Sequence, residues 1–498
     1  MSVKSIVPAA VIGILLLALQ TAGGAWNAEF DGYPDEAAQF VTGRMIWEYV
    51  SDLPSGSPIE WAEQYYLHYP KVGLGHWPPA YHVAEALWSF VFGSSRVSAI
   101  WLQWILGLAS LTGLYAIARP RFPTAVTWAI VLFAMASPVF QQGLEQTMAE
   151  LSCLLCSILF ILASLQLFKH SDYLTNAAVA AVIVVAIAVK GTGVCLIGVP
   201  FLILSVAGQR TPWRIWWFLT ATAGVLIILV FWLKGGNSIA YWSGMKTSFI
   251  WPVAALGGLL GWGFAGLAIF GLRRDPLAIV AACIILSSIV TSFALRAMNE
   301  PRHWIMVLPP LLLLAGYAVS TLPRWLAALL AGMAILLFPW RFYHQTPAGY
   351  ADLIRQLHLP SRVLVSSGRG AIGEGGWVAE MSIAERYPAS FVVRASKLLS
   401  ESGWNGEHYL LLAPDTKAVE KILDEVAIDV VVLEAPRANF PTHHVLLASA
   451  MATSPSWKAC GQTNNILAWC RIQPPRFLRK PLVMKFGGWL ATEKFSRR

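Results

Sequence analysis

Long apolar runs restrict the fold of this 498-residue chain more than any other feature of its sequence. They recur from Ile6 to Trp340, and a run of about 18 or more apolar residues can cross the hydrocarbon core of a bilayer as a helix. Only 13% of all residues are charged, whereas a soluble domain averages about 25%. The sequence therefore predicts a polytopic all-α membrane protein over most of its length.

We predict about eleven transmembrane helices from these runs. They lie near residues 6–25, 96–118, 123–140, 146–168, 172–189, 191–207, 214–234, 249–272, 276–295, 303–320 and 324–341. After His344, charges, prolines and short alternating segments replace the apolar runs. We therefore expect a membrane domain over 1–343 with a long outer loop over 26–95, a small extracytoplasmic α/β domain over 344–475, and a basic tail over 476–498.

The basic residues predict the topology. Every second connection between spans is short and basic, with Lys4, Arg119, Arg121, Lys169, Arg210, Arg214, Arg273, Arg274 and Arg324. The positive-inside rule places these connections and the N-terminus in the cytoplasm. An odd number of spans then puts the loop 26–95 and the C-terminal domain outside the cell's inner or plasma membrane. The same scattering of the net charge of +9 argues against a nucleic-acid partner.

The first span has a second interpretation, because Lys4, a short apolar core and the small residues of 21–25 also fit a cleaved signal peptide. Cleavage leaves all later segments on the same side. The outer face then holds ionisable residues from five separate segments, which are Asp31, Asp35, Glu36, Lys71, His76, His82, Glu145, Glu150, Lys190, Arg296, Glu300, Arg302 and His303. Because such groups at span ends are costly and mostly functional or paired, they predict a site for a charged, membrane-embedded substrate.

The stretch DGYPDEAAQFVTGR directly follows the first span. Pro34 can open a helix, which puts Asp35 and Glu36 in its first turn, where the helix dipole favours acids. One interpretation is a simple helix cap. The other is a carboxylate that takes a proton from an attacking hydroxyl, within hydrogen-bond reach of the substrate.

A second stretch, HYPKVGLGHWPPAYH, spans His68 to His82. Paired prolines fix a rigid extended turn, and the aromatic residues around them suit a membrane interface. Two explanations fit the stretch equally well. One is an aromatic belt with a kink, and the other is a substrate pocket to which His76, Tyr81 and His82 contribute.

Together, the two stretches resemble the GT-C superfamily of polyprenyl-phosphate-sugar-dependent glycosyltransferases, in the branch of the protein O-mannosyltransferases and the lipid A aminoarabinose transferases. Members carry an acidic pair in the first outer loop, as in Asp35-Glu36, and later a proline pair of the type HPPL or KPPL, as in HWPPAYH. This sequence departs from that pattern, because Trp77 separates His76 from the prolines and the cation of the KPP form is missing. Lys71 lies nearby but out of register.

Three further segments resemble the family in the same order along the chain. They are GLEQTMAE ending at Glu150, AVKGTG around Lys190, and NEPRHWIMVLPPLLLLAGYAV with Arg302. Snorkelling to the headgroups is one explanation of Lys190 and Arg302. The resemblance implies the other, in which both cations hold the donor phosphate, because arginine grips phosphate bidentately and lysine adds a point charge.

The resemblance implies an inverting transfer of a sugar from a polyprenyl-phosphate donor, undecaprenyl-linked in a bacterium, to an acceptor hydroxyl on a lipid, polysaccharide or protein. Asp35 is then the base, Glu36 orients the site or binds the acceptor, and Lys71, His76, Tyr81, His82 and Glu150 are substrate-binding candidates. We expect no obligatory metal, since the carboxylates and histidines show no compact ligand set, although some GT-C enzymes use divalent ions. A transporter or flippase for a lipid or anionic solute, and a non-catalytic envelope assembly protein, are the alternatives.

In the C-terminal domain, Gly368 to Gly373 form a formal GxGxxG. The acid that a dinucleotide site needs about twenty residues later is absent, so we interpret the motif as a tight turn. Short buried strands are expected at 363–365, 391–393, 410–412 and 430–433, with a helix over 416–426. Cys460 and Cys470 form either a disulfide, which an oxidising compartment favours, or two free thiols.

Overall fold

The structure is a computed structural model. It describes residues 3–53, 56–73, 76–169, 172–207, 224, 250–295, 300–358, 360–385, 388–401, 409–435, 437, 439–473, 480–486 and 489–493. The chain forms two compact units. Unit 1 comprises Met1–Ala25, Gly75–Tyr81 and Ile100–His344, and unit 2 comprises Trp26–Leu74, His82–Ala99 and Gln345–Arg498.

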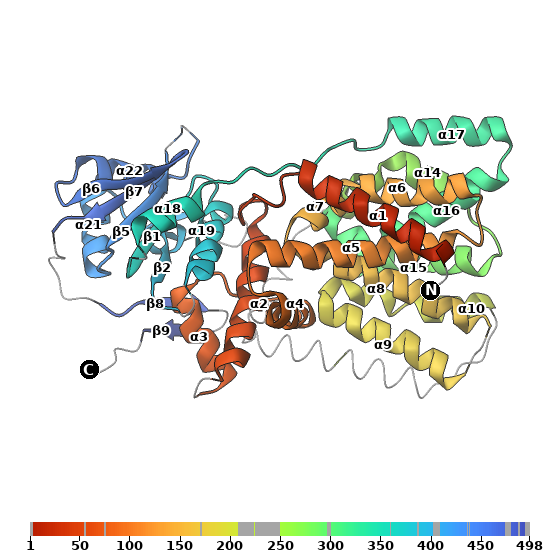
Figure 1. Ribbon diagram of the computed structural model, residues 1–498, viewed down its shortest axis with the longest axis horizontal. Helices are drawn as coiled ribbons and strands as arrows, with labels where there is room; N and C mark the ends of the chain where they lie inside the picture. The colour runs from red at the N-terminus through yellow and green to blue at the C-terminus, as the bar shows by residue number, and fades with distance from the viewer. Residues whose placement is uncertain are drawn as a thin grey trace. The chain divides into compact units, whose positions relative to one another are not determined.

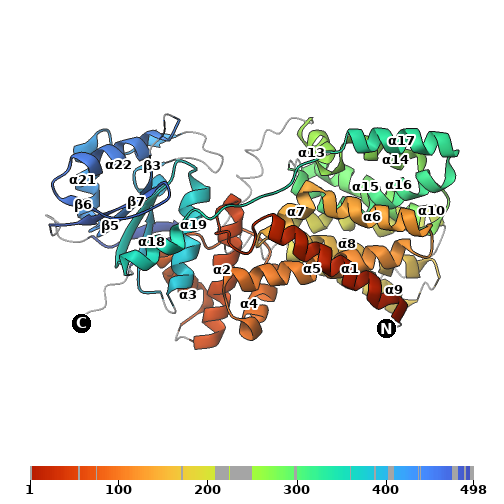
Figure 2. The ribbon, with the colours of Figure 1, turned by 45° about the horizontal axis from the view of Figure 1, so that its top comes forward.

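Unit 1 is helical in the part of the chain described. Its elements are α1 (Val3–Ala22), α5 (Arg96–Ala118, which begins in unit 2), α6 (Thr124–Ala136), α7 (Pro138–Glu145), α8 (Glu150–Leu167), α9 (Tyr173–Val189), η1 (Gly191–Leu196), α10 (Val199–Ala207), α13 (Ile250–Leu260), α14 (Trp262–Phe270), α15 (Pro276–Leu295), η2 (Pro301–Val307), α16 (Leu308–Thr321) and α17 (Arg324–Leu336). Figures 1 and 2 show α6, α14, α16 and α17 as neighbours, and α8 lies beside α9. A single large apolar core joins most of these helices.

Four helices are long and apolar enough to cross a membrane among the described residues, namely Arg96–Ala118, Glu150–Leu167, Pro276–Ala294 and Pro301–Thr321. The pair α6 and α7 also passes when taken together, although it bends by 62°. The bend lies at Pro138, which cannot continue the i to i−4 hydrogen bonds of α6. Each predicted span contains helix among its described residues, and of 214–234 only residue 224 is described. The predicted polytopic helical fold is confirmed.

Unit 2 combines the outer loop with the C-terminal residues. The loop forms α2 (Pro34–Asp52), α3 (Pro58–His68) and α4 (Ala80–Phe92), whose first two residues belong to unit 1. The C-terminal residues form α18 (Tyr350–Leu357), β1 (Arg362–Ser366), α19 (Ala371–Ala384), β2 (Phe391–Arg394), α20 (Ala395–Leu398), β3 (Ser400–Glu401), β4 (Leu410–Leu411), α21 (Thr416–Glu425), β5 (Val430–Glu434), α22 (Thr442–Thr453), β6 (Trp457–Thr463), β7 (Ile466–Arg471), β8 (Val483–Phe486) and β9 (Trp489–Thr492). Both parts share one apolar core.

A five-stranded mixed sheet in the order β2-β1-β5-β7-β6 is the centre of the C-terminal part. β1 pairs in parallel with β2 and β5, whereas β7 pairs antiparallel with β5 and β6. The near-continuous valine and leucine runs of β1 and β5 are buried, as expected for parallel strands covered on both faces. The predicted strands at 363–365, 391–393 and 430–433 and the helix over 416–426 are confirmed.

The prediction of a buried strand at 410–412 is wrong. β4 lies outside the main sheet, pairs antiparallel with the two-residue β3, and leaves Leu410 56% exposed. The sheet is instead completed by the hairpin β6–β7, which the sequence analysis does not predict because polar residues interrupt its alternation. A second hairpin, β8–β9, lies within the segment expected to be a basic tail and contacts α3.

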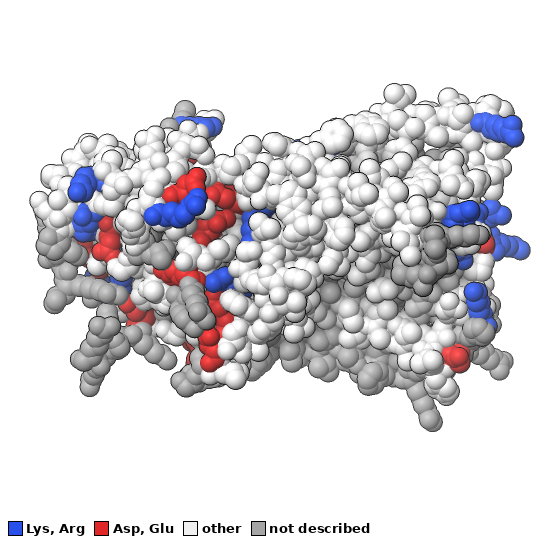
Figure 3. Space-filling view, viewed as in Figure 1, with Lys and Arg blue, Asp and Glu red and all other residues white. Residues whose placement is uncertain are grey.

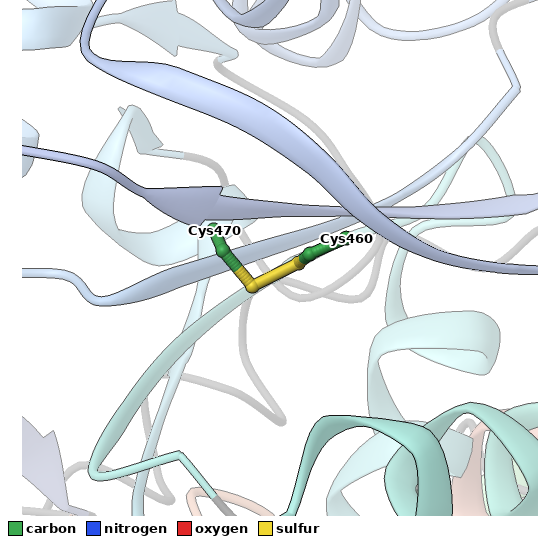
Figure 4. Close-up of a disulfide and its surroundings, with 2 residues drawn as sticks. All are labelled: Cys460 and Cys470. Atoms are coloured by element: carbon green, nitrogen blue, oxygen red, sulfur yellow. A yellow bond between two sulfur atoms is a disulfide. The ribbon is translucent and has the colours of Figure 1, made fainter.

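Cys460 and Cys470 form a disulfide, which decides between the two alternatives (Figure 4). The bond joins β6 to β7, whose register shifts between Ala459 and Gly461. Cys460 therefore lies at a bulge, and its side chain meets Cys470 although the two are not direct cross-strand partners. The other four cysteines, all in unit 1, are buried thiols.

We expect reduction of this disulfide to destabilise unit 2. Because the bond closes a loop with a sequence separation of 10, its loss should lower the free energy of unfolding by about 2–3 kcal/mol. The measurement is chemical unfolding of the wild type and the Cys460→Ser/Cys470→Ser variant, followed by tryptophan fluorescence. An unchanged midpoint of the double variant would contradict the expectation, and Cys283→Ser serves as the thiol control.

Candidate functional site

The two acids of the predicted pair have different environments at the start of α2. Glu36 is fully buried, and its Oε1 lies 3.3 Å from Nη2 of Arg96. Arg96 also donates to Gln345 Oε1 at 3.2 Å, so this ion pair links three segments of unit 2. Asp35 is only partly buried. The accessible carboxylate of the pair is therefore Asp35, while Glu36 is engaged in a buried structural contact.

Helix α19 holds the segment that precedes α2. Arg369, just before α19, places Nη1 2.8 Å from Oδ2 of Asp31. Arg44 of α2 donates from Nη2 to the carbonyl oxygen of Glu385, at the other end of α19, at 2.9 Å. These contacts fix both ends of α19 against the acidic loop.

A glycine in α19 allows this close packing. A Cβ atom on Gly375 would lie 2.4 Å from Cε of Lys71 and 3.4 Å from Cβ of Ala37. Any larger residue would therefore push Lys71 or α2 away. The glycine-rich stretch that contains the GxGxxG pattern thus serves contact between protein segments, in agreement with its interpretation as a turn rather than a dinucleotide site.

Lys71 is held beside the candidate base. Its Nζ donates to the carbonyl oxygen of Pro34 at 2.8 Å, one residue before Asp35. Burial, assisted by the positive charge of Arg394, lowers the pKa of Lys71 from its ordinary value of 10.5 to about 7, and the carboxylates of Asp35 and Glu374 oppose this shift. A lysine whose pKa lies near 7 can gain or lose a proton at physiological pH.

The aromatic and histidine candidates lie in both units. Tyr81 is buried in unit 1, and its hydroxyl accepts from Gln103 Nε2 at 2.8 Å. His76 packs edge-on against Trp77, with ring centroids 4.7 Å apart. His82 is buried in unit 2, and burial lowers its pKa to about 4, so its ring is neutral at pH 7.

In unit 1, Lys190, Arg302 and Glu150 come together. Nζ of Lys190 lies 2.5 Å from Oε1 of Glu150, and Nη1 of Arg302 lies 3.6 Å from the same oxygen. The two cations are 9% and 8% exposed, and Glu150 is 1% exposed. Nε of Arg302 also pairs with the half-exposed Glu300 at 2.6 Å. Two cations thus converge on one buried carboxylate in unit 1.

Interruptions of the helices position these three residues. Lys190 lies in extended conformation between the end of α9 and the 3-10 turn η1. Arg302 lies in the 3-10 turn η2, which precedes the proline pair at the start of α16. Glu150 is the first residue of α8, where the helix dipole favours a carboxylate. Charged groups therefore gather where regular helix ends.

The structure adds three residues that the sequence analysis missed, which are Arg96, Arg369 and Glu29. Arg96 is the first residue of a predicted span, and Arg369 lies inside the GxGxxG pattern before a predicted helix. The signal in the sequence was therefore a charged residue at the end of a predicted element. Glu29 accepts hydrogen bonds from the backbone N–H groups of residues 349–351 at 2.8–3.0 Å. Among the described residues, no group of three His, Cys, Asp or Glu could hold a metal ion. Arg296 lies outside those residues.

The surface charge differs between the units. Figure 3 shows acidic side chains grouped with basic ones over unit 2, whereas the visible face of unit 1 is largely uncharged and carries basic side chains near one end of its helices. Arg119, Arg121, Arg273, Arg274 and Arg324 of the predicted cytoplasmic connections are all exposed. An uncharged helical surface is what a bilayer requires.

Comparisons with known proteins agree with this architecture. A family model described as dolichyl-phosphate-mannose-protein mannosyltransferase matches residues 76–233. No curated protein matches the chain. In structure, the chain is similar to ArnT from Cupriavidus metallidurans bound to undecaprenyl phosphate, with a TM-score of 0.54 and 15% identity over 94% of this chain and 98% of that one.

The archaeal oligosaccharyltransferase AglB from Archaeoglobus fulgidus, in complex with an inhibitory peptide and a dolichol-phosphate, is also similar. Its TM-score is 0.52, with 10% identity over 86% of this chain and 69% of that chain. ArnT in the apo state gives a TM-score of 0.53 at 15% identity, over 92% of this chain and 97% of that one. At these identities the likeness shows a shared fold.

We expect Glu150→Gln to destabilise unit 1. The substitution leaves two buried cations without their shared counter-charge, and breaking a buried pair from one side costs about 3–5 kcal/mol. The measurement is thermal unfolding in nanodiscs. Glu150→Gln combined with Lys190→Met should recover part of the loss, because one cation is removed with the carboxylate. Equal stabilities of the single and double variants would contradict this coupling, and Glu63→Gln is the control.

We also expect Lys71 to make the stability of unit 2 depend on pH. Its folded-state pKa of about 7 lies below the ordinary 10.5, so between these values the unfolded chain binds a proton that the folded chain does not. Stability that is present above pH 10.5 is therefore lost as the pH falls toward 7. The difference in unfolding temperature, Lys71→Met minus wild type, should increase as the pH falls from 10 to 7. Below pH 7 it should stay constant. A constant difference would contradict the pKa, and Lys417→Met is the exposed control.

Proposed function

We propose that this chain is a membrane glycosyltransferase of the GT-C superfamily and transfers a sugar from a polyprenyl-phosphate donor to an acceptor hydroxyl with inversion. The observation that carries the proposal is the convergence of Lys190 and Arg302 on one buried carboxylate in a chain of this fold. The family match over 76–233 and the similarity to ArnT bound to undecaprenyl phosphate support the class of donor.

The donor phosphate binds to Lys190 and Arg302 in this proposal. Glu150 keeps both cations in position while the site is empty, and the phosphate oxygens take over part of its role when the donor binds. As the bond between the anomeric carbon and the phosphate oxygen breaks, negative charge grows on the leaving phosphate. Fixed cations in an apolar surrounding stabilise that charge without reorganisation.

Asp35 is the proposed base. It is the accessible member of the acidic pair, whereas Glu36 is buried against Arg96. Asp35 takes the proton of the acceptor hydroxyl as the hydroxyl oxygen attacks the anomeric carbon from the side opposite to the phosphate. Lys71 donates a hydrogen bond to the carbonyl oxygen of Pro34, the residue before Asp35, and its charge changes the electrostatic potential at Asp35. Glu36 then acts by holding the first turn of α2 in place.

The reaction takes place on the extracytoplasmic side in this proposal. The disulfide between Cys460 and Cys470 suits an oxidising compartment. The exposed arginines of the short connections in unit 1 suit the cytoplasmic side. Both observations support an orientation with the loop 26–95 and the C-terminal residues outside.

We expect Asp35→Asn to abolish transfer while leaving the fold intact. A positioned general base contributes about 10²–10⁴-fold to a rate, so release of polyprenyl phosphate should fall by at least 100-fold. The assay uses protein in nanodiscs, a panel of polyprenyl-phosphate sugars and acceptor-rich membrane extract. Glu63→Gln, an acid in the same loop, should keep full activity.

Each outcome of this assay has a distinct meaning. If Asp35→Asn leaves turnover unchanged, the chain is still a transferase but Asp35 is not its base. No turnover of any donor by the wild type would argue against the transferase and for transport of a lipid or anionic solute. Lys190→Met should raise the KM for the donor, and an unchanged KM would remove Lys190 from the phosphate site.

A further inference from the structure

A pocket in unit 2 is lined by none of the proposed base and donor-binding residues, although Arg96 in its wall pairs with Glu36. It has a volume of about 410 Å³ and lies between the segment after α1, the start of α5, the start of α18, α19 and the β6–β7 turn. Pockets of about 300–1,000 Å³ are typical of small-molecule sites. Its lining includes Trp26, Glu29, Arg96, Glu380, Ile383 and Asn464.

Glu380 of α19 is the unusual member of this lining. Its side chain faces the pocket, yet the residue is only 8% exposed. Among the described residues it makes no hydrogen bond or ion pair. Its carboxyl group therefore depends on solvent in the pocket, or on a ligand, for hydrogen bonds. Burial and the nearby carboxylates of Glu29, Glu36 and Asp31 raise its pKa to about 8, and the charge of Arg96 opposes the shift.

The other charged groups in the lining already have partners. Both oxygens of Glu29 accept backbone N–H groups at the start of α18. Arg96 is held by Glu36 and Gln345. Asp352 pairs with Arg355. Glu380 is therefore the charged residue of the lining that has no partner within the part of the chain that the structure describes.

The charge of the lining selects the class of ligand. The lining holds three acids, Glu29, Glu380 and Asp352, and the single cation Arg96. Even while Glu380 is protonated, the two other carboxylates outnumber Arg96, so the field disfavours phosphates and carboxylates. The half-buried Trp26 and Ile383 offer apolar surface beside the polar groups. A neutral molecule with several hydroxyl donors and an apolar ring face meets both conditions, and a sugar is such a molecule.

We infer that this pocket binds a neutral sugar unit of the acceptor, whose hydroxyls form hydrogen bonds with the Glu380 carboxyl group. The inference rests on the proposed function for the identity of the sugar as part of an acceptor. It narrows the acceptor to a molecule that carries carbohydrate. The chemical step is unchanged, because the pocket recognises the acceptor at a distance from the reacting hydroxyl.

The test measures sugar binding without any donor. The full chain in nanodiscs is titrated with glucose, galactose, mannose, N-acetylglucosamine and their β-linked disaccharides, and binding is followed by saturation-transfer NMR and by the shift in unfolding temperature. At least one neutral sugar should bind, and glucuronic acid should bind at least 10-fold more weakly than glucose.

Two variants place the sugar in this pocket. The binding assays are run at pH 9, where the Glu380 side chain is ionised. Glu380→Gln keeps the shape of the side chain but removes its charge at that pH, so it should weaken binding at least 10-fold while leaving the ligand-free unfolding temperature equal or higher. Ile383→Trp fills the pocket from one turn further along α19 and should abolish binding. Glu420→Gln, on α21 of the same unit, should bind as the wild type does.

The inference fails if no neutral sugar binds the wild type, if glucuronic acid binds as well as glucose, or if both pocket variants bind as the wild type does. These results are independent of donor turnover. If the chain binds a sugar, Glu380→Gln weakens that binding and no donor is turned over, the pocket is a sugar site but the chain is not a transferase.

Discussion

Inside a bilayer, the backbone must satisfy its own hydrogen bonds, so a helix can be interrupted only where protein surrounds the break. Unit 1 contains such interruptions before α7, between α9 and η1, and at η2. Lys190 and Arg302 lie at two of them and meet the first residue of α8. At these interruptions the backbone is not α-helical. Charged side chains can therefore point toward one another there, instead of lying along one face of a helix.

The buried carboxylate of Glu150 makes this arrangement stable. Two cations without it would repel each other in a medium where water does not screen them. With Glu150 and with Glu300, which pairs with Arg302 at 2.6 Å, two carboxylates balance the two cations, so an anion that binds here takes the place of a carboxylate. The same reasoning explains why Glu36 and Arg96 are paired in unit 2, although there the pair holds a helix start rather than a ligand.

Much of the fold follows from the sequence because its signals are local. Apolar run length predicted the helices of unit 1, and the valine runs at 363–365 and 430–433 predicted buried parallel strands. The grouping of Glu150, Lys190 and Arg302 was also expected, since all three lie at span ends on one predicted face. The environments of Asp35 and Glu36 could not be predicted, because Arg96 lies 60 residues beyond Glu36. The β6–β7 hairpin escaped prediction because its outer strand is mostly polar.

The shared core of the outer loop and the C-terminal residues has a consequence for biosynthesis. The loop leaves the ribosome early, but the segment around α19 that contacts its residues Asp31 and Arg44, and the strand before it, begin only after Gln345. At about 5–20 residues per second, translation needs on the order of tens of seconds to cover the interval. During that time the apolar side chains of α2 and α3 lack their partners. A nascent chain of this kind therefore depends on protection of its first loop until the last third of the protein has been made.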